Sequence, residues 1–287
     1  RIGLLEGLLR DQKDGYIEAS MAGLTNTLRL KHSKIVNLPG VTKKLGTEIR
    51  GSLIAEDDGI LCGSDMSSLE DTTKQHYMYF YDPKYVMEMR TPGFDPHLDI
   101  AVLASLLTKE QVAAHKAGTE NHKATRHKAK TVNFSAVYGA GPPKIALTAG
   151  MSLKEAKKLH KIYWERNKAV KQVAEACIVK QIGHKKWLYN PVSKFWYSLR
   201  AEKDRFSTLN QGTGVWCFDN YVKQVRMRGI KISVQMHDEI LFKTKEKDKD
   251  YIKYQLQQSI DSVNAIVQLN IALGISVDFG KNYADCH

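Results

Sequence analysis

The sequence predicts an α+β fold, because short β-branched or apolar segments near both ends of the chain flank a long central region of helical pattern. Residues 60–66 and 239–243 are the clearest strand segments, and residues from about 98 to 182 form the helical region. The chain has 287 residues, 43% of them hydrophobic, so it can bury a sizeable core in one large domain or two modest ones.

The N-terminal part predicts loops and short strands, since its first fifty residues mix glycine with short apolar and basic runs and reach a turn at Pro39-Gly40. The apolar run 60–66 predicts a strand whose C-terminal end delivers Asp65 to a cleft. A helix is expected from about Glu70 onwards, and the proline- and glycine-rich break at 91–96 predicts a domain junction.

The central region predicts helices with clear boundary signals. The apolar segment 98–107 comes first, and one long helix over 120–138 is stopped by the Gly- and Pro-rich run 139–143. Ser152 followed by Glu155 forms a capping box, which predicts a basic amphipathic helix running to about Ile182.

The C-terminal part returns to mixed structure. Aromatic segments at 187–189 and 195–197 around Pro191 predict a hairpin, and helical character returns over 211–227. Runs at 230–234 and 239–243 flank residues 235–238 and predict a tight hairpin with an acidic tip. A helix is expected over 251–267.

Composition restricts the partners. Lys and Arg number 43 against 31 Asp and Glu, a formal charge of +12, and the pI is 9.3. This balance indicates a polyanionic partner, with nucleic acid ahead of an acidic membrane surface. The longest apolar stretch, residues 100–107, is far shorter than the roughly 20 residues of a membrane-spanning helix, so no membrane partner is expected.

The four cysteines and the N-terminus carry further expectations. No CxxC pair or metal-ligand spacing occurs among the cysteines, so we expect reduced thiols without a disulfide or structural zinc, and a cytoplasmic location. The chain starts at Arg1 without an initiator methionine or a signal peptide, which predicts a fragment or a processed chain.

Four residues spaced by four, Arg126, Lys130, Phe134 and Tyr138, predict one functional stripe on the helix 120–138. Each step of four rotates only about 40° around the helix, so the stripe is roughly 18 Å long. Two cations followed by two aromatic rings match a nucleoside triphosphate, with its anionic tail, sugar and flat base. The alternative is an ordinary amphipathic helix whose aromatic end enters the core.

Acidic residues occur at two predicted strand ends, Asp65 on one and Asp238 with Glu239 on the other. If they converge opposite the cationic stripe, their carboxylates could hold two Mg²⁺ ions, the arrangement for which polymerases are a standard example. Taken singly, each is more often a solvated turn residue or a helix cap.

Three motifs in order carry a resemblance to a known family: Asp65-Met66-Ser67-Ser68-Leu69-Glu70, the R-x3-K-x3-F-x3-YG run from Arg126 to Gly139, and His237-Asp238-Glu239. They resemble motifs A, B and C of the family A, or DNA polymerase I-like, DNA polymerases of bacteria and bacteriophages. Four other segments are similar to the family as well: residues 28–30 with Asn37-Leu38-Pro39, Asp95-Pro96-His97, Gln211-Gly212-Thr213, and the C-terminal segment 280–287.

The resemblance implies a right-hand polymerase architecture with an antiparallel-sheet palm and an inserted helical fingers subdomain. Residues 1–92 would form the first part of the palm, 93–200 the fingers and 201–287 the second part of the palm. The thumb would be largely absent, and a thumb or exonuclease segment or chain, and a processivity factor, are possible partners. Primer-template DNA and dNTPs are the implied substrates.

The resemblance also implies roles for individual residues. Asp65, Asp238 and the carbonyl of Met66 would bind two Mg²⁺ ions, for which Mn²⁺ is a possible substitute, and Glu239 would lie near the primer terminus. The triphosphate, sugar and base would contact Arg126, Lys130, His97, Phe134 and Tyr138, with Lys130 as proton donor to pyrophosphate. Glu70 would favour deoxyribonucleotides, while Arg29, Gln211 and His237 would contact DNA.

Motif A departs from the family pattern Asp-Tyr-Ser-Gln-Ile-Glu-Leu-Arg. Met66 replaces Tyr, Ser68 replaces Gln, and Asp71-Thr72 replaces Leu-Arg, so one primer-side cation is lost. The leading hypothesis is a template-directed DNA polymerase. A single-subunit RNA polymerase and a non-catalytic basic DNA-binding module are the alternatives, and Glu70 argues against the first of these.

Overall fold

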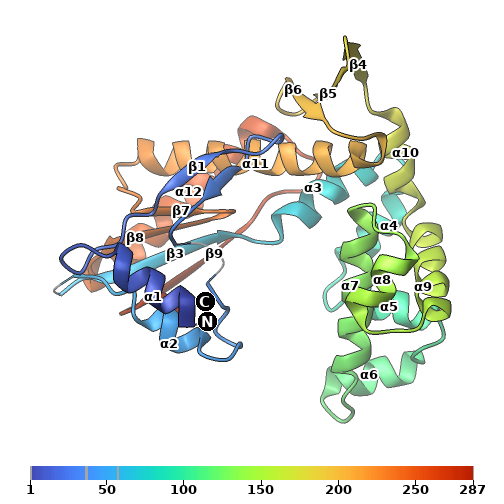
Figure 1. The fold of residues 1–287 in the computed structure, drawn as a ribbon, viewed down its shortest axis with the longest axis horizontal. Helices are drawn as coiled ribbons and strands as arrows, with labels where there is room; N and C mark the ends of the chain where they lie inside the picture. Colours follow the sequence, from blue (N-terminus) through green and yellow to red (C-terminus); the bar gives the residue numbers. More distant parts are fainter. Residues whose placement is uncertain (1, 36–37, 57, 287) are drawn as a thin grey trace. The chain divides into compact units, whose positions relative to one another are not determined.

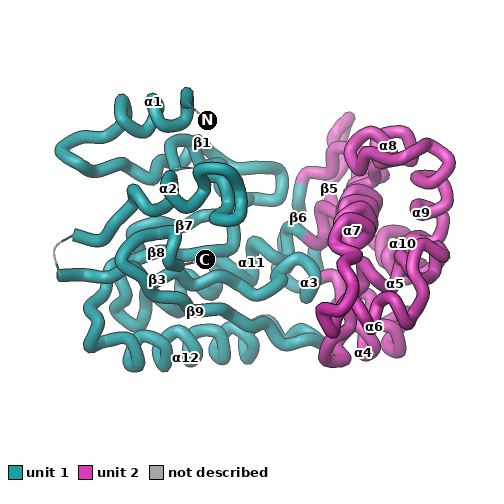
Figure 2. Tube along the Cα trace, turned by 90° about the horizontal axis from the view of Figure 1, so that it is seen from below, with its two compact units in different colours: residues 1–73, 190–197, 211–287 teal, residues 74–189, 198–210 magenta. Residues whose placement is uncertain are grey.

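A computed structural model describes residues 2–35, 38–56 and 58–286 of the chain. Asn37 and His287, which carry part of the family resemblance, lie outside the described residues. The chain divides into two compact units, residues 1–73, 190–197 and 211–287 in unit 1, and 74–189 and 198–210 in unit 2 (Figure 2). Both helices and strands occur among the described residues, so the α+β composition predicted from the sequence is confirmed.

Unit 1 is built on a four-stranded antiparallel sheet of order β7-β8-β3-β9. The elements of unit 1, with α3 crossing into unit 2, are α1 (Ile2–Asp11), β1 (Met21–Leu24), β2 (Leu30–His32), α2 (Gly46–Gly51), β3 (Ile60–Met66), α3 (Leu69–Met78), α11 (Arg205–Met227, which starts in unit 2), β7 (Val234–Met236), β8 (Glu239–Thr244), α12 (Lys249–Val267) and β9 (Ile275–Gly280). Short 3₁₀ turns cover 246–248 and 283–286.

The core of unit 1 lies between the sheet and the helices α11 and α12, which cover the same face in Figure 1. Alternation along β3 sends Cys62 and Met66 into this core, and Phe242 opposite Cys62 joins them from β8. A buried hydrogen bond of 2.7 Å between Ser64 and Tyr221 ties β3 to α11. The intervening positions of β3, including Asp65, therefore face the opposite side of the sheet.

Unit 2 is mostly helical. Its helices are α4 (Pro83–Met89), α5 (Pro96–Leu103), α6 (Lys109–Ala117), α7 (Lys123–Val137), α8 (Pro142–Ala149), α9 (Leu153–Arg166) and α10 (Lys168–Ala176). A small sheet of β4 (Val179–Ile182), β5 (Lys185–Asn190) and β6 (Phe195–Leu199) follows, and within β5 and β6 the chain passes between the units.

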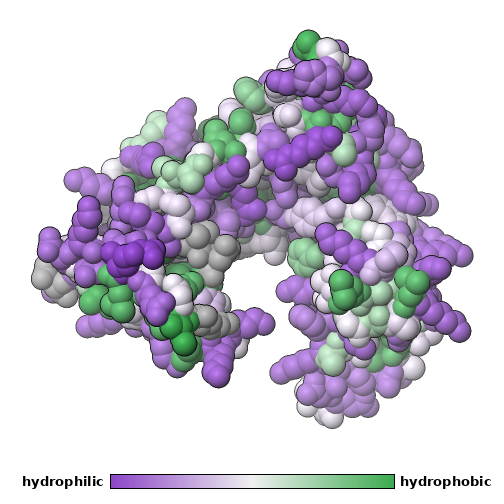
Figure 3. Space-filling view, viewed as in Figure 1, coloured by the Kyte–Doolittle hydropathy of each residue, from purple (hydrophilic) through white to green (hydrophobic). Residues whose placement is uncertain are grey.

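Four helices of unit 2 meet in its larger cluster of buried apolar side chains. Ile100 from α5, Val132 from α7, Ile145 from α8 and Leu159 from α9 meet there, each at most 2% exposed. On the face drawn in Figure 3, most of the surface is hydrophilic, with separate hydrophobic patches, as expected for a strongly charged chain. Among the described residues, no helix has both the length and the apolar character needed to cross a membrane.

Several predicted elements are confirmed: the strand 60–66, the helices over 120–138, 211–227 and 251–267, and the capping box of Ser152 and Glu155. The aromatic hairpin near 187–197 is also present as β5 and β6.

The predicted helix from Ser152 to about Ile182 is wrong in its second half. It breaks at Asn167, whose buried side chain donates to the carbonyl of Tyr163 at 3.0 Å, and α10 ends at Ala176. Asparagine competes for backbone partners in this way, which favours helix ends. The β-branched residues that follow pair with β5 instead of continuing the helix.

Three other segments differ from the prediction. The first fifty residues contain two helices, α1 and α2, beside the expected short strands. The helix predicted over 98–107 ends at Leu103, and the strand predicted over 230–234 starts only at Val234. The end of α5 lies just before Ser105, whose φ of 56° is in the left-handed region that commonly ends a helix. The predicted subdomain boundaries at 92/93 and 200/201 do not coincide with the unit boundaries and stay a prediction.

Candidate active site

Two acidic motifs that lie far apart in the sequence become neighbours in the sheet of unit 1. Asp65 near the end of β3 is directly opposite Glu239 at the start of β8. The backbone N–H of Met66 donates to the carbonyl of Asp238 at 3.0 Å. Strand register therefore brings Asp65, Asp238 and Glu239 to one end of the sheet.

The position of Asp238 depends on a tight turn. β7 and β8 pair antiparallel, with Met236 opposite Glu239, so the turn contains only His237 and Asp238. His237 has φ of 50°, the left-handed conformation that a two-residue hairpin requires. The predicted hairpin is confirmed, with its acidic tip next to the end of β3.

Burial and mutual repulsion raise the affinity of these acids for protons. The pKa of Asp65 is raised to about 7, first by burial and then by the charge of Asp238. The pKa of Glu239 is also raised to about 7, mainly by burial and further by Asp65. Tyr283 partly opposes this second shift, because its hydroxyl donates to Glu239 Oε2 at 2.9 Å.

The carboxylates of Asp65 and Asp238 are suited to a divalent cation whose remaining ligands come from substrate and water. Among the described residues, no group of three or more Asp, Glu, His or Cys side chains is arranged to hold a metal ion by itself. Mg²⁺ is commonly bound by one or two carboxylates together with substrate phosphates and water. Asp65 and Asp238, adjacent and mutually repelling, supply such a pair.

Met66 faces away from this acidic end. Its side chain is 1% exposed and packs in the core under the sheet. The methionine that stands in place of the family's tyrosine is therefore an apolar core residue. Of Met66, only the backbone carbonyl is a candidate metal ligand.

The predicted DNA-contacting residues line one pocket beside the acidic end. Arg29, Glu70, Gln211, His237 and Asp238 all contribute to its wall. Arg29 and Glu70 are 3.9 Å apart, a loose ion pair between the β1–β2 segment and α3. The structure thus brings together, within unit 1, four residues predicted from four separate segments and one member of the acidic pair.

The cationic and aromatic stripe of α7 lies on the surface of unit 2. Phe134 and Tyr138 are 49% and 39% exposed, whereas Ala129, Val132 and Ala136 form the buried side of the segment. Lys130 Nζ lies 5.7 Å from the centre of the Phe134 ring. The alternative in which the aromatic end enters the core is therefore wrong for this helix.

Arg126 is tied to the start of α5. Its Nε donates to Asp95 Oδ2 at 2.6 Å, while Asp95 Oδ1 accepts the backbone N–H groups of His97 and Leu98. Asp95 is thus an N-cap and an ion-pair partner at once, which explains why its pKa is lowered despite burial.

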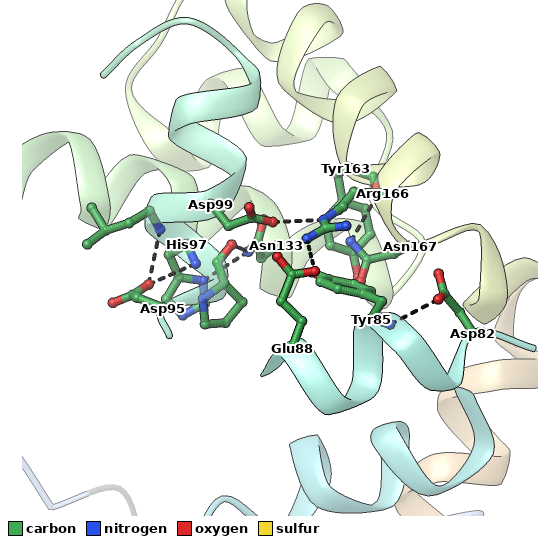
Figure 4. Close-up of polar contacts among 12 residues, drawn as sticks. Asp82, Tyr85, Glu88, Asp95, His97, Asp99, Asn133, Tyr163, Arg166 and Asn167 are labelled. Carbon is green, nitrogen blue, oxygen red and sulfur yellow. Dashed lines mark hydrogen bonds and ion pairs between the residues drawn. The ribbon is translucent and has the colours of Figure 1, made fainter. Parts of the chain in front are cut away.

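His97 lies beside the same stripe. Its ring centre is 5.9 Å from that of Phe134, and its Nδ1 is 2.9 Å from Asn133 Nδ2 (Figure 4). The pKa of His97 is lowered to about 4, first by burial and also by Arg126, Lys130 and Lys74, although Asp95 acts in the opposite direction. His97 is therefore neutral near pH 7.

Sequence reasoning gave no role to several residues that hold these groups in place. Asn133 contacts His97, Tyr283 contacts Glu239, and the His32 ring lies 5.7 Å from that of His237. Asn133 falls inside the motif B segment and Tyr283 inside the C-terminal segment, so the resemblance pointed to both regions without naming a contact.

Comparison with known proteins identifies relatives along nearly the whole chain. Residues 4–207 match the family model described as DNA polymerase family A. DNA polymerase I of Lactococcus lactis is 25% identical over 94% of this chain and 31% of its own length. DNA polymerase I of Helicobacter pylori is 25% identical over 96% of this chain and 31% of its own length.

A solved structure supports the same fold. The polymerase domain of Pol1 from M. smegmatis, in complex with DNA primer-template and dNTP, superimposes with a TM-score of 0.75 and 20% identity. The match covers 99% of this chain and 51% of that one. The chain spans about three tenths of the length of the curated relatives. Since the family model matches well over half of its residues, the chain belongs to DNA polymerase family A.

Proposed function

We propose that this chain carries the nucleotidyl-transfer site of a template-directed DNA polymerase, which extends a primer 3′-hydroxyl with dNTPs and releases pyrophosphate. The observation that supports this most directly is the strand register that sets Asp65 opposite Glu239 and beside Asp238. Burial and neighbouring acids raise the pKa values of Asp65 and Glu239, and a bound cation would offset this cost by stabilising the charged carboxylates.

In this proposal unit 1 is the palm and unit 2 is the fingers. Support comes from the composition of the units, since the four-stranded sheet belongs entirely to unit 1 and the α7 stripe to unit 2. Apart from the short segments 190–197 and 198–210, the units follow one another along the chain as unit 1, unit 2 and unit 1, which is the order expected of palm, fingers and palm. Their boundaries make α3 and α11 the connecting helices.

Mg²⁺ or Mn²⁺ bound by Asp65, Asp238 and the Met66 carbonyl would lower the pKa of the attacking hydroxyl and neutralise charge on the leaving group. In unit 2, Lys130 and Arg126 would bind the triphosphate, and the neutral His97 would donate a hydrogen bond to it. Lys130 would also give a proton to the departing pyrophosphate. Phe134 and Tyr138 offer exposed rings for the sugar and base.

The pocket in unit 1 suggests how primer and sugar are recognised. Arg29, Gln211 and His237 would contact DNA, while Glu70 on the same pocket wall would exclude a 2′-hydroxyl. Arg29 is held near Glu70 by charge, so the DNA contact and the sugar contact would be linked.

Primer extension by the wild-type chain and by Asp238→Asn, with dNTPs and Mg²⁺, tests the proposal. We expect Asp238→Asn to lose about a thousandfold in incorporation rate, because an electrostatic element of the reaction is removed. DNA binding measured by fluorescence anisotropy should stay within about twofold, since no phosphate contact changes. Asp261→Asn is the matched control, because this exposed residue lies on α12, against the other face of the sheet.

The same assay separates the alternatives. Extension with rNTPs alone would indicate an RNA polymerase, and salt-sensitive DNA binding without any extension would indicate a binding module. Undiminished synthesis by Asp238→Asn would contradict the assignment of the acidic site.

A further inference from the structure

The side-chain amide of Asn133 makes two short contacts at the start of α5. Its Nδ2 lies 3.2 Å from the carbonyl oxygen of Pro96 and 2.9 Å from Nδ1 of His97. Figure 4 shows Asn133 and His97 directed toward each other from neighbouring helices. Asn133 Oδ1 is buried and accepts no hydrogen bond from any described residue, so these contacts hold the side chain through its nitrogen.

The carbonyl of Pro96 determines which way the amide points. With the amide reversed, Oδ1 would face the Pro96 oxygen, and two acceptors would meet without a proton between them. With Nδ2 in place, one amide hydrogen is donated to Pro96 and the other to His97 Nδ1. Nδ1 is then an acceptor, so the single proton of a neutral ring must be on Nε2.

The surroundings of His97 favour the neutral ring. Burial is the main cause of the lowered His97 pKa, and Arg126, Lys130 and Lys74 oppose a positive charge there as well. Asp95 is the one neighbour among these groups that favours the cation, and Arg126 already engages it. A neutral ring with one fixed proton is a directional hydrogen-bond donor that adds no charge.

We propose that Asn133 is a positioning residue, which fixes His97 as the Nε2–H tautomer so that the ring donates a hydrogen bond to a polyphosphate bound at the Arg126 and Lys130 stripe. The identity of the ligand rests on the proposed function. The placement supports it, because the His97 ring and Lys130 Nζ lie 5.9 Å and 5.7 Å from the same Phe134 ring. In this arrangement Arg126 and Lys130 attract the phosphates by charge, and the Nε2–H of His97 donates one directional hydrogen bond to them.

The tautomer can be measured on the wild-type protein by two-bond ¹H–¹⁵N correlation spectra of ¹⁵N-histidine-labelled chain. We expect His97 Nδ1 to show the shift of an unprotonated nitrogen, Nε2 that of a protonated one, and no titration between pH 8 and pH 5. A proton on Nδ1, or a titration midpoint near 6.5, would overturn the proposal. This measurement needs no variant and does not depend on folding of a mutant.

The Asn133→Asp variant then tests the cause. A carboxylate accepts and cannot donate to Nδ1, so we expect a proton on Nδ1 and a His97 pKa raised by at least about one unit. An unchanged His97 spectrum would contradict the role of Asn133. Asn121→Asp is the matched control, because this exposed side chain accepts through Oδ1 from the N–H of Lys123 and should leave His97 unchanged.

Inorganic tripolyphosphate serves as the ligand probe, so that this inference and the proposed function can fail separately. Adding it should shift His97 Hε2 and Nε2 in the wild type and in Asn121→Asp, with affinity about tenfold weaker in Asn133→Asp. In primer extension, KM for dNTP should rise by a similar factor, with a smaller change in kcat. If tripolyphosphate leaves His97 unaffected, the proposal is wrong even if synthesis occurs. If it shifts His97 but the wild-type chain extends no primer, the proposed function fails and this inference stands.

Discussion

The acidic end of the sheet in unit 1 and the cationic stripe of α7 in unit 2 are built in opposite ways. The acids come from separate segments, meet through strand register and are buried enough to raise their pKa values. The stripe comes from one helix by a repeat of four, and its aromatic rings are exposed. Truncating a buried side chain on a strand of the acidic site should therefore destabilise the fold, whereas truncating an exposed ring of the stripe should affect ligand binding more than stability.

The largest expected effect comes from a matched pair of truncations. Phe242 is 1% exposed in the core of unit 1, on the strand that carries Glu239, and Phe134 is 49% exposed on α7. We expect Phe242→Ala to lower the free energy of unfolding by about 3–5 kcal/mol, and Phe134→Ala by less than about 1 kcal/mol, in urea unfolding experiments. Phe134→Ala should instead raise KM for dNTP about tenfold. Equal destabilisation by the two would remove the distinction between the sites.

A smaller effect is expected where a buried acid loses its hydrogen-bond donor. Tyr283→Phe removes the hydroxyl that donates to Glu239, which should cost about 1–3 kcal/mol of unfolding free energy. The pKa of Glu239 should rise further, because that hydrogen bond lowers it. Tyr254→Phe, at a tyrosine that is 60% exposed, is the control and should change little.

The two sites should also respond to pH with opposite sign. Asp65 binds a proton more tightly when folded, with its pKa raised from 3.8 to about 7, so its contribution to stability in metal-free buffer should fall as pH rises through this range. His97 binds a proton less tightly when folded, with its pKa lowered from 6.5 to about 4, so its contribution should fall as pH decreases from 6.5.

Each contribution has a slope of at most about 1.4 kcal/mol per pH unit. Unfolding free energies of Asp65→Asn and His97→Gln, measured between pH 4 and 8 with EDTA present, separate them. Relative to the wild type, the first variant should gain stability toward pH 8 and the second toward pH 4. The same sign of change in both variants would contradict the opposite electrostatics of the two sites.

The smallest effect is expected at Asp95. Asp95→Asn keeps an oxygen that can cap α5 but removes the charge that engages Arg126. Because Arg126 is partly exposed, the loss of stability should be at most about 1 kcal/mol. The freed guanidinium should bind tripolyphosphate more tightly, by a few-fold in calorimetry. Weaker binding would show that Asp95 helps Arg126 to face the anion.

The α7 stripe and the Ser152 capping box were predictable because helix geometry relates near neighbours in the sequence. The break at Asn167 was not, since an asparagine inside an amphipathic pattern gives no sign of whether its side chain competes for the backbone. The strand β9 beside β3 was also not predicted, because its pattern is weak and its partner is more than two hundred residues away.

The sequence alone determined the α+β composition, the basic charge, the spacing on α7 and the three motifs that carry the family resemblance. These are local properties, which depend on residue type and short-range geometry. Only the tertiary structure decided that Asp65 lies opposite Glu239, that Phe134 and Tyr138 are exposed, and that Asn133 reaches His97. Register, burial and hydrogen-bond direction depend on which segments pack together, and no short window of sequence contains both partners.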